Sequence, residues 1–351
     1  MTDLQHAHAL PGRIYHGADA HDFDRAQILR RSWQLLGNLS QLADTGDHIV
    51  GDIGDVPVLI VRDEEGRLRG FENICRHRAG PLATCAGRGA KALRCRYHGW
   101  TYTLSGQLRA ATEMGEALDF ATQDIRLRDI HVAVWRGLVF AALDPHVTLD
   151  ELMRGTETRL GDRDFSHYRF DRRVSYPVAC NWKVYVENYL EGYHVPHVHP
   201  ALNAMLDYRS YVTIAEHWHS LQWSPLENAS AGNFYGDGDA LYYCLWPNTM
   251  LNILPNRLQT NRVIATGPDT CQVDFDYYYP EGDSAAELER RATDQRFSEE
   301  VQAEDAEICM QVQKALASGR YQPGRINPKR ENAVFHYHQL LRDVYGERAG
   351  D

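Results

Sequence analysis

Two short segments of the chain each pair a cysteine with a histidine. The first is Cys75-Arg-His77, and the second, seventeen residues further on, is Cys95-Arg-Tyr-His98. Together they offer two thiolates and two imidazoles. Structural zinc takes such a set in a tetrahedron, and so does a [2Fe–2S] cluster in which two histidines replace two cysteines on one iron. The spacing alone leaves both metal centres open.

A second histidine group, which contains His194, His197 and His199, follows a helix predicted over residues 181–191. Two histidines and one carboxylate on one face of a ferrous ion leave positions open for O₂ and substrate. The carboxylate must come from elsewhere, and a long helix predicted over residues 285–318 offers Asp305. At ~100° per residue Asp305 falls inside the helix's apolar stripe, whereas Glu304 lies at its edge and Glu300 and Glu307 outside. The apolar stripe consists of Phe297, Val301, Ile308, Val312 and Leu316. A buried carboxylate is costly unless it is paired or bound to a metal, so Asp305 is predicted as the third ligand, with an Asp–Arg pair as the alternative.

The residues around both groups resemble one known family. Cys75-Arg-His-Arg-Ala-Gly-Pro81 and Cys95-Arg-Tyr-His-Gly-Trp100 resemble the cluster-binding loops of Rieske non-haem iron oxygenases, which favours the cluster over zinc. Neither loop has the extra cysteine of respiratory Rieske proteins, and Cys85 is interpreted as a plain thiol. The stretch from Glu191 to His199 resembles the family's iron-binding segment. This resemblance implies His194, His199 and Asp305 as iron ligands, with His197 as the competitor of His199.

The resemblance also implies how electrons travel. In the family, an acidic residue at the position of Glu191 links the iron site of one subunit to a Rieske histidine of the next, which here is His98. We therefore expect Glu191 to be catalytic and the protein to be a homotrimer; a glutamate on a helix surface is the alternative. The chain has no Gly-x-Gly-x-x-Gly loop, so a separate flavin reductase or ferredoxin must supply the electrons.

The substrate is the least determined feature. A glutamate at position 191 is typical of relatives that act on choline, betaine and carnitine, which favours O₂-dependent hydroxylation or oxidative N-demethylation of a quaternary amine. Ring hydroxylation of an aromatic acid is the second hypothesis, and an electron carrier without oxygenase activity is the third; a scaffold with structural zinc is a remote fourth. Asn188 and Trp246 are candidate substrate contacts. Four aromatic residues could form a cage for a quaternary ammonium group or could be core aromatics, and both interpretations stay open: Trp223, Phe234, Tyr242 and Trp246. A carboxylate-bearing substrate would need an arginine in the pocket, and Arg257 and Arg262 are the candidates.

The composition and net charge narrow the class of protein. The 351 residues carry a net charge of −11, which disfavours a nucleic-acid partner because phosphate binding needs clustered Lys and Arg. No export signal or membrane-spanning stretch is recognised. Seven cysteines without such a signal favour a reducing cytoplasm.

The order of predicted elements indicates an α+β protein. The family resemblance implies an all-β Rieske domain at residues 38–145 and a helix-grip (START-like) catalytic domain with an antiparallel sheet at residues 146–351. Residues 1–37 are expected to pack on the catalytic domain through a helix over residues 22–36. Strands are predicted at residues 56–61, 68–74, 132–135, 138–142, 174–179, 211–214, 241–246, 251–254 and 271–279, and a short helix at residues 149–154.

Overall fold

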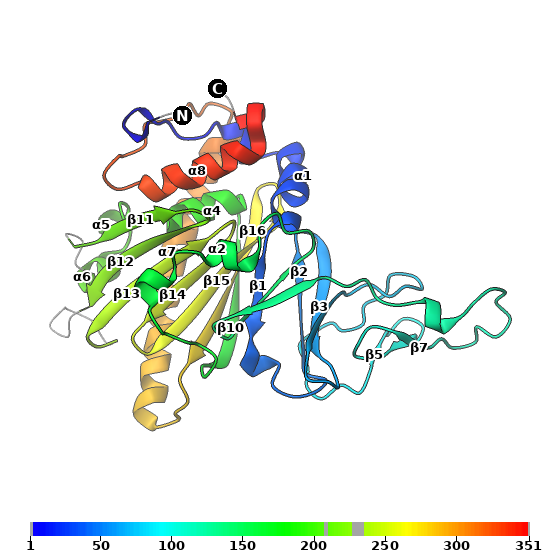
Figure 1. The fold of residues 1–351 in the computed structure, drawn as a ribbon. Helices are drawn as coiled ribbons and strands as arrows, with labels where there is room; N and C mark the ends of the chain where they lie inside the picture. The colour runs from blue at the N-terminus through cyan, green and yellow to red at the C-terminus, as the bar shows by residue number, and fades with distance from the viewer. Residues whose placement is uncertain (1–2, 207–209, 227–234, 350–351) are drawn as a thin grey trace. The chain divides into compact units, whose positions relative to one another are not determined.

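The computed structural model describes residues 3–206, 210–226 and 235–349 (Figure 1). The chain divides into two compact units. One contains residues 29–149 and 162–170, and the other contains residues 1–28, 150–161 and 171–351.

The first unit is built from small antiparallel sheets. Its strands are β1 (Gln34–Asn38), β2 (His48–Ile53), β3 (Val56–Arg62), β4 (Leu68–Glu72), β5 (Leu93–Arg94), β6 (Thr101–Tyr102), β7 (Leu108–Ala110), β8 (His131–Trp135) and β9 (Leu138–Ala142). They form three sheets with the orders β1-β9-β8, β2-β3-β4 and β5-β6-β7. The strands predicted at residues 132–135 and 138–142 are confirmed as β8 and β9, which form a hairpin across Arg136-Gly137. Both turn residues have positive φ, as a tight turn between twisted strands requires.

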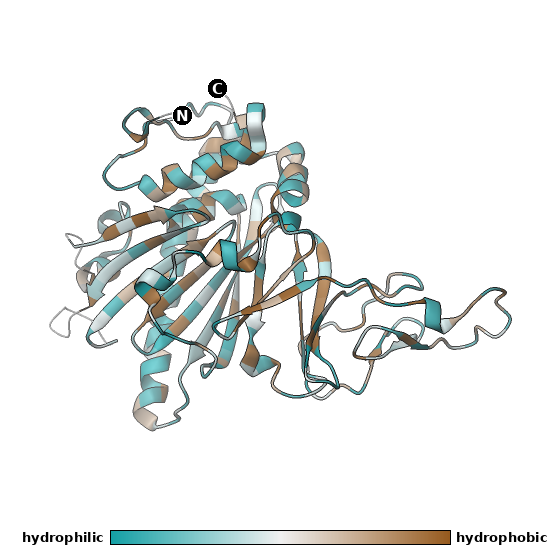
Figure 2. Ribbon diagram, in the orientation of Figure 1, coloured by the Kyte–Doolittle hydropathy of each residue, from teal (hydrophilic) through white to brown (hydrophobic). Residues whose placement is uncertain are grey.

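The second unit contains a seven-stranded sheet in the order β10-β16-β15-β14-β13-β12-β11. These strands are β10 (Arg169–Val178), β11 (Val212–Glu216), β12 (His219–Leu226), β13 (Gly238–Leu245), β14 (Thr249–Leu254), β15 (Arg257–Gly267) and β16 (Thr270–Tyr279). Hydrophilic and hydrophobic residues are interleaved along the strands (Figure 2), as expected where side chains alternate between two faces. Some of the hydrophilic residues on these strands are buried.

Helices complete this unit. They are α1 (Ala18–Gln27), α3 (Glu157–Leu160), α4 (Trp182–Tyr189), α5 (Val195–Val198), α6 (Pro200–Met205), α7 (Ala285–Ala317) and α8 (Asn332–Tyr345); α2 (Leu149–Met153) lies where the units divide. Helix α4 begins where the Asn181 side chain accepts a hydrogen bond from Lys183 N. Helix α7 begins at a capping box made by Ser284 and Glu287, and it runs along the sheet (Figure 1). The predicted α+β class is confirmed.

Three expectations need correction. The helix predicted over residues 22–36 ends at Gln27, because residues 34–38 pair with β9 as strand β1; residues 29–37 therefore belong to the first unit. The helix predicted over residues 181–191 ends at Tyr189, and Pro196 lies in the first turn of the separate helix α5. A proline fits there because the first helical N–H groups need no partner within the helix. Strands β12 and β15 and helix α8 were not predicted.

Among the described residues, no helix has the length and hydropathy required to cross a bilayer.

Candidate metal centres and substrate pocket

The two cysteine–histidine segments fold into loops with matching backbone hydrogen bonds. In the first loop Ala79 N donates to Cys75 O at 3.0 Å, and in the second Gly99 N donates to Cys95 O, also at 3.0 Å. Ala79 and Gly99 both have positive φ, at 58° and 74°. The loops therefore present their cysteines through equivalent turns.

The four predicted donors come together between these loops. Cys75 and Cys95 are buried, and the ring centroids of His77 and His98 lie 4.6 Å apart. The Nδ1 atom of His77 is buried, and no described residue forms a hydrogen bond with it, which is unusual for a polar atom unless a ligand completes it. A Cβ on Gly80 would lie 2.8 Å from Cys95 Sγ, so only glycine permits this approach. The donor set and its surroundings fit a Rieske cluster.

Tyr102 was not predicted to contribute, yet its hydroxyl lies 3.2 Å from Cys75 Sγ. The same hydroxyl accepts a hydrogen bond from Arg76 N at 3.0 Å, so its own proton is directed to the sulfur. Burial and the nearby Cys75 raise the pKa of Tyr102, which keeps that proton in place. Hydrogen bonds to cluster sulfurs are one determinant of reduction potential.

The second predicted group also comes together. His194, His199 and Asp305 each offer one ligand atom, and these atoms all lie within 4.8 Å of one another. His194 directly precedes α5, His199 lies between α5 and α6, and Asp305 comes from α7. Asp305 Oδ1 lies 2.9 Å from His199 Nε2 and 3.7 Å from His194 Nε2. Two imidazoles and one carboxylate converging in this way fit a facial triad for ferrous iron.

A second carboxylate orients each imidazole. Glu191 Oε1 lies 2.7 Å from His194 Nδ1, and Glu304 Oε2 lies 2.6 Å from His199 Nδ1. Glu191 also accepts hydrogen bonds from the backbone N–H groups of Tyr193 and His194. A carboxylate on Nδ1 fixes the ring's orientation and leaves Nε2 for the metal. Glu304 was placed only at the edge of the apolar stripe, and its contact with His199 was not foreseen.

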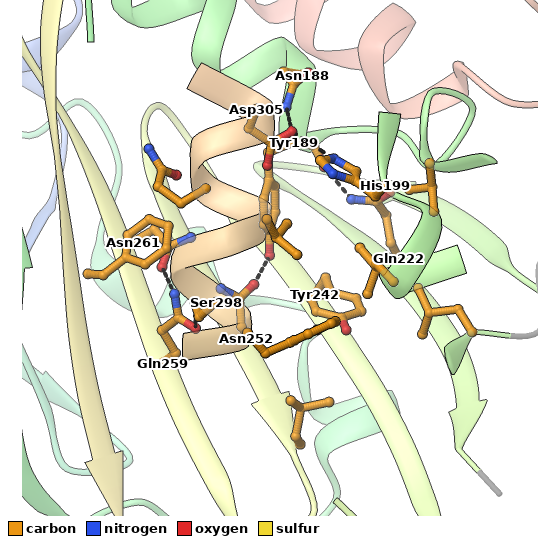
Figure 3. Close-up of a pocket in the computed structure, with 18 of the residues that line it drawn as sticks. Asn188, Tyr189, His199, Gln222, Tyr242, Asn252, Gln259, Asn261, Ser298 and Asp305 are labelled. Carbon is orange, nitrogen blue, oxygen red and sulfur yellow. Dashed lines mark hydrogen bonds and ion pairs between the residues drawn. The ribbon is translucent and has the colours of Figure 1, made fainter. Parts of the chain in front are cut away.

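The third ligand is oriented as well. Asn188 Nδ2 donates to Asp305 Oδ1 at 2.6 Å (Figure 3), so this candidate substrate contact already holds a predicted ligand. His199 is 1% exposed. Burial lowers its pKa, but the hydrogen bonds and charges of Asp305 and Glu304 outweigh that effect and raise the pKa above its ordinary value.

A cavity of about 130 Å³ reaches the triad. Its lining combines the three ligand candidates with aromatic side chains and uncharged amides from α4, α7 and the sheet. The aromatic lining residues are Tyr185, Tyr189, Tyr211, Tyr235, Tyr242, Phe275 and Phe297. A mostly uncharged pocket beside a metal triad is the usual form of a small-molecule site.

The remaining predicted contacts are distributed unevenly. Of the suggested cage, Tyr242 lines this cavity, Trp223 and Trp246 do not, and Phe234 lies outside the described residues. Trp246 packs against Tyr337 beside a separate small cavity. Of the two candidate arginines, Arg257 lines the pocket and Arg262 does not. His197, the competitor of His199, is exposed and is not part of the triad group.

Comparison with known proteins agrees with this geometry. Residues 32–135 match the Rieske [2Fe–2S] domain, and residues 165–347 match the ring hydroxylating alpha subunit (catalytic domain). The chain belongs to the Rieske oxygenases of the ring-hydroxylating alpha-subunit family. Its cofactors are accordingly a [2Fe–2S] cluster and a mononuclear iron, and it is an enzyme that works with O₂, a small substrate and a reductase or ferredoxin.

Two curated relatives of this Rieske oxygenase cover nearly its whole length. The chloroplastic choline monooxygenase of Arabidopsis thaliana is 33% identical over 96% of this chain and 83% of that protein. The carnitine monooxygenase oxygenase subunit of Escherichia coli K12 is 25% identical over 97% of this chain and 95% of that protein.

Solved structures show the same fold. A quaternary ammonium Rieske monooxygenase, CntA, superimposes with a TM-score of 0.89 at 22% identity, covering 97% of this chain and 96% of that one. Naphthalene 1,2-dioxygenase from Rhodococcus sp. superimposes with a TM-score of 0.78 at 19% identity, covering 97% and 94%.

Proposed function

We propose that this Rieske oxygenase hydroxylates or oxidatively N-demethylates a quaternary amine. The observation that carries the proposal is the triad of His194, His199 and Asp305 at one end of a cavity lined by aromatic rings and uncharged amides. Aromatic faces attract a quaternary ammonium group, and full-length relatives are named choline and carnitine monooxygenases.

The residues have separate tasks in this proposal. Cys75, His77, Cys95 and His98 hold the cluster, whereas His194, His199 and Asp305 hold iron. Bound iron supplies the O₂ chemistry that oxidises a C–H bond. The protein's own part is to orient the imidazoles, to place a methyl group beside the triad and to exclude water.

Glu191 is proposed to connect the two metal centres across a subunit boundary. Its Oε1 atom lies 2.7 Å from His194 Nδ1, which places a hydrogen-bonding group directly on one iron-ligand candidate. A route from His98 of a neighbouring subunit through Glu191 needs a head-to-tail ring, and we therefore propose a homotrimer.

The surface around the cluster loops supports an acidic electron donor. Residues 73–112 contain seven Arg or Lys residues and no Asp or Glu, although the whole chain carries a charge of −11. The seven are Arg76, Arg78, Arg88, Lys91, Arg94, Arg96 and Arg109, and all are exposed. Complementary charge raises the association rate of partners and makes it sensitive to salt, so the donor is proposed to be an acidic reductase or ferredoxin.

The cytoplasm is the proposed location. All seven cysteines are described, and none forms a disulfide, which suits a reducing compartment.

The test begins with anaerobically purified protein. About three irons and two acid-labile sulfides per chain, with a Rieske visible spectrum, are expected if both centres load. Choline, glycine betaine, carnitine and benzoate are then screened for O₂ uptake coupled to release of formaldehyde or a hydroxylated product. Uptake with benzoate alone would favour ring hydroxylation, and cluster reduction without O₂ uptake for any candidate would favour an electron carrier. Zinc without sulfide would overturn the assignment of both sites.

A further inference from the structure

Four amide side chains form one wall of the substrate cavity. Asn252 comes from β14, Gln259 and Asn261 come from β15, and Gln302 comes from α7. All four are at most 5% exposed. Buried amides are costly unless their polar atoms are paired, so the way in which each atom is used shows what the wall can bind.

The oxygens of these amides are already occupied. Tyr185 OH donates to Gln302 Oε1, and Tyr189 OH donates to Asn252 Oδ1 at 2.6 Å. Burial raises the pKa of both tyrosines well above the usual value, so both hydroxyls keep their protons. The oxygens of Gln259 and Asn261 accept hydrogen bonds in one chain. Ser298 Oγ donates to Gln259 Oε1 at 3.2 Å, and Gln259 Nε2 donates to Asn261 Oδ1 at 2.9 Å.

The amide nitrogens are what remains for a ligand. Gln302 Nε2 is buried and has no hydrogen-bond partner among the described residues. Asn252 and Asn261 use only their oxygens in hydrogen bonds within the described chain. Gln222 provides a contrast in the same cavity, because its nitrogen donates to Tyr189 O and its oxygen accepts from Tyr211 OH. The wall therefore presents the amide N–H groups of Asn252, Asn261 and Gln302 as donors, and the described residues supply no acceptor for them.

Arg257 adds to this donor character. It lines the cavity and is 6% exposed. Its Nη1 is paired with Asp294, whereas its Nε atom is buried and finds no partner in the part of the chain that the structure describes. Acceptor groups lie instead near the triad, where Glu191 and Asp305 are found. In Figure 3 Asn252, Gln259 and Ser298 lie toward the bottom of the view, away from Asp305 and His199 at the top.

We propose that this amide wall is a subsite for a carboxylate, so that the substrate is a quaternary amine that also carries a carboxylate. A carboxylate only accepts hydrogen bonds, whereas the hydroxyl of an amino alcohol also needs an acceptor. The inference rests on the proposed function for the ammonium end of the substrate. It departs from the name of the 33% identical relative, which is a choline monooxygenase.

Three matched probes test the carboxylate end separately from the ammonium end. Glycine betaine has both groups, choline replaces the carboxylate with a hydroxymethyl group, and 3,3-dimethylbutanoate replaces the ammonium nitrogen with carbon. Binding to the anaerobic holoenzyme is measured by titration calorimetry, and O₂ uptake is measured in parallel. We expect wild-type protein to bind glycine betaine at least roughly tenfold more tightly than choline, which is about the size of one hydrogen bond to a charged group.

Asn261→Asp replaces one donor with an acceptor of the same size. The substitution is expected to lower the affinity for glycine betaine and for 3,3-dimethylbutanoate by roughly tenfold or more, while the affinity for choline stays within about threefold of the wild-type value. Gln311→Glu, the same kind of change on the exposed face of α7, is the control and should change neither. The wild-type comparison needs no variant, so the test does not depend on Asn261→Asp folding.

The outcomes separate the two proposals. Tight binding of 3,3-dimethylbutanoate that Asn261→Asp weakens, without O₂ uptake for any quaternary amine, supports the subsite and contradicts the proposed function. Choline binding as tightly as glycine betaine, or an equal effect of Asn261→Asp on both, overturns the subsite and leaves the proposed function intact. If no carboxylate-bearing probe binds, the subsite is overturned whatever choline does.

Discussion

Removing Glu304 should weaken iron binding although Glu304 is not expected to touch the metal. Its Oε2 atom lies 2.6 Å from Nδ1 of His199, whose side chain is 1% exposed. In Glu304→Ala, this buried nitrogen loses its acceptor, so the imidazole is less well oriented and less basic at Nε2. His194 keeps its own partner, Glu191. The expected loss therefore concerns one of the three ligands.

The size of the loss follows from the surroundings of Glu304. Removing a carboxylate that orients a metal-bound histidine typically costs 10–100-fold in metal affinity, or about 1.4–2.7 kcal/mol. The Glu304 side chain is 31% exposed, so water can replace part of its hydrogen bond. We therefore expect Glu304→Ala to fall near the lower end, at roughly tenfold.

The assay is anaerobic titration of Fe(II) into protein whose mononuclear site has been emptied while the cluster spectrum is retained. Glu307→Ala is the matched control, because Glu307 is an exposed glutamate on the same helix. The reasoning is refuted if both variants bind Fe(II) with wild-type affinity, or if both lose affinity equally. The second result would indicate that helix charge, not the contact with His199, sets the affinity.

Three further outcomes are expected. Asp305→Ala should lower iron from about three to two per chain while sulfide stays near two, and it should abolish O₂ uptake; unchanged iron content would remove Asp305 from the ligand set. Tyr102→Phe should lower the cluster's reduction potential, by roughly 40 mV for each ~1 kcal/mol of hydrogen bonding lost in a one-electron couple; spectroelectrochemistry that finds no shift would mean that the hydroxyl does not reach the sulfur in solution. Asp24→Asn should destabilise the protein by about 3–5 kcal/mol in denaturant unfolding, because Asp24 and Lys183 form an ion pair with both side chains 0% exposed. Asp22→Asn, at a largely exposed position two residues earlier on α1, should have little effect, and equal losses for the two variants would contradict this account of the buried pair.

Much of the metal chemistry was available from local sequence. Cys75, His77, Cys95 and His98 occur in two loops whose side-chain types alone define a donor set. His194 and His199 are likewise close in sequence, so their residue types could be recognised as a donor pair from one short segment. Asp305 lies more than a hundred residues away, but helical periodicity placed it on the buried side of a long helix, and the structure brings it within 2.9 Å of His199.

Local propensity was less informative where tertiary pairing decides the structure. Residues 34–38 continue a pattern that is compatible with a helix, yet they form β1 because β9 offers a strand partner. Strand β15 was missed because Gln259 and Asn261 interrupt the apolar pattern of a central strand. That interruption was itself a signal, since amides at buried strand positions indicate a polar cavity.

The sequence by itself determined the types of metal donor, because cysteine, histidine and aspartate bring their coordination chemistry wherever the chain places them. Only the tertiary structure decided what surrounds those donors. Glu304 became an orienting partner of His199 through the packing of α7 against the segment between α5 and α6. Asn252, Gln259, Asn261 and Gln302 became a wall of donors because β14, β15 and α7 meet there and nearby hydroxyl and amide groups occupy their oxygens. The direction in which an amide points depends on its neighbours in space, and those neighbours come from parts of the chain that no local pattern connects.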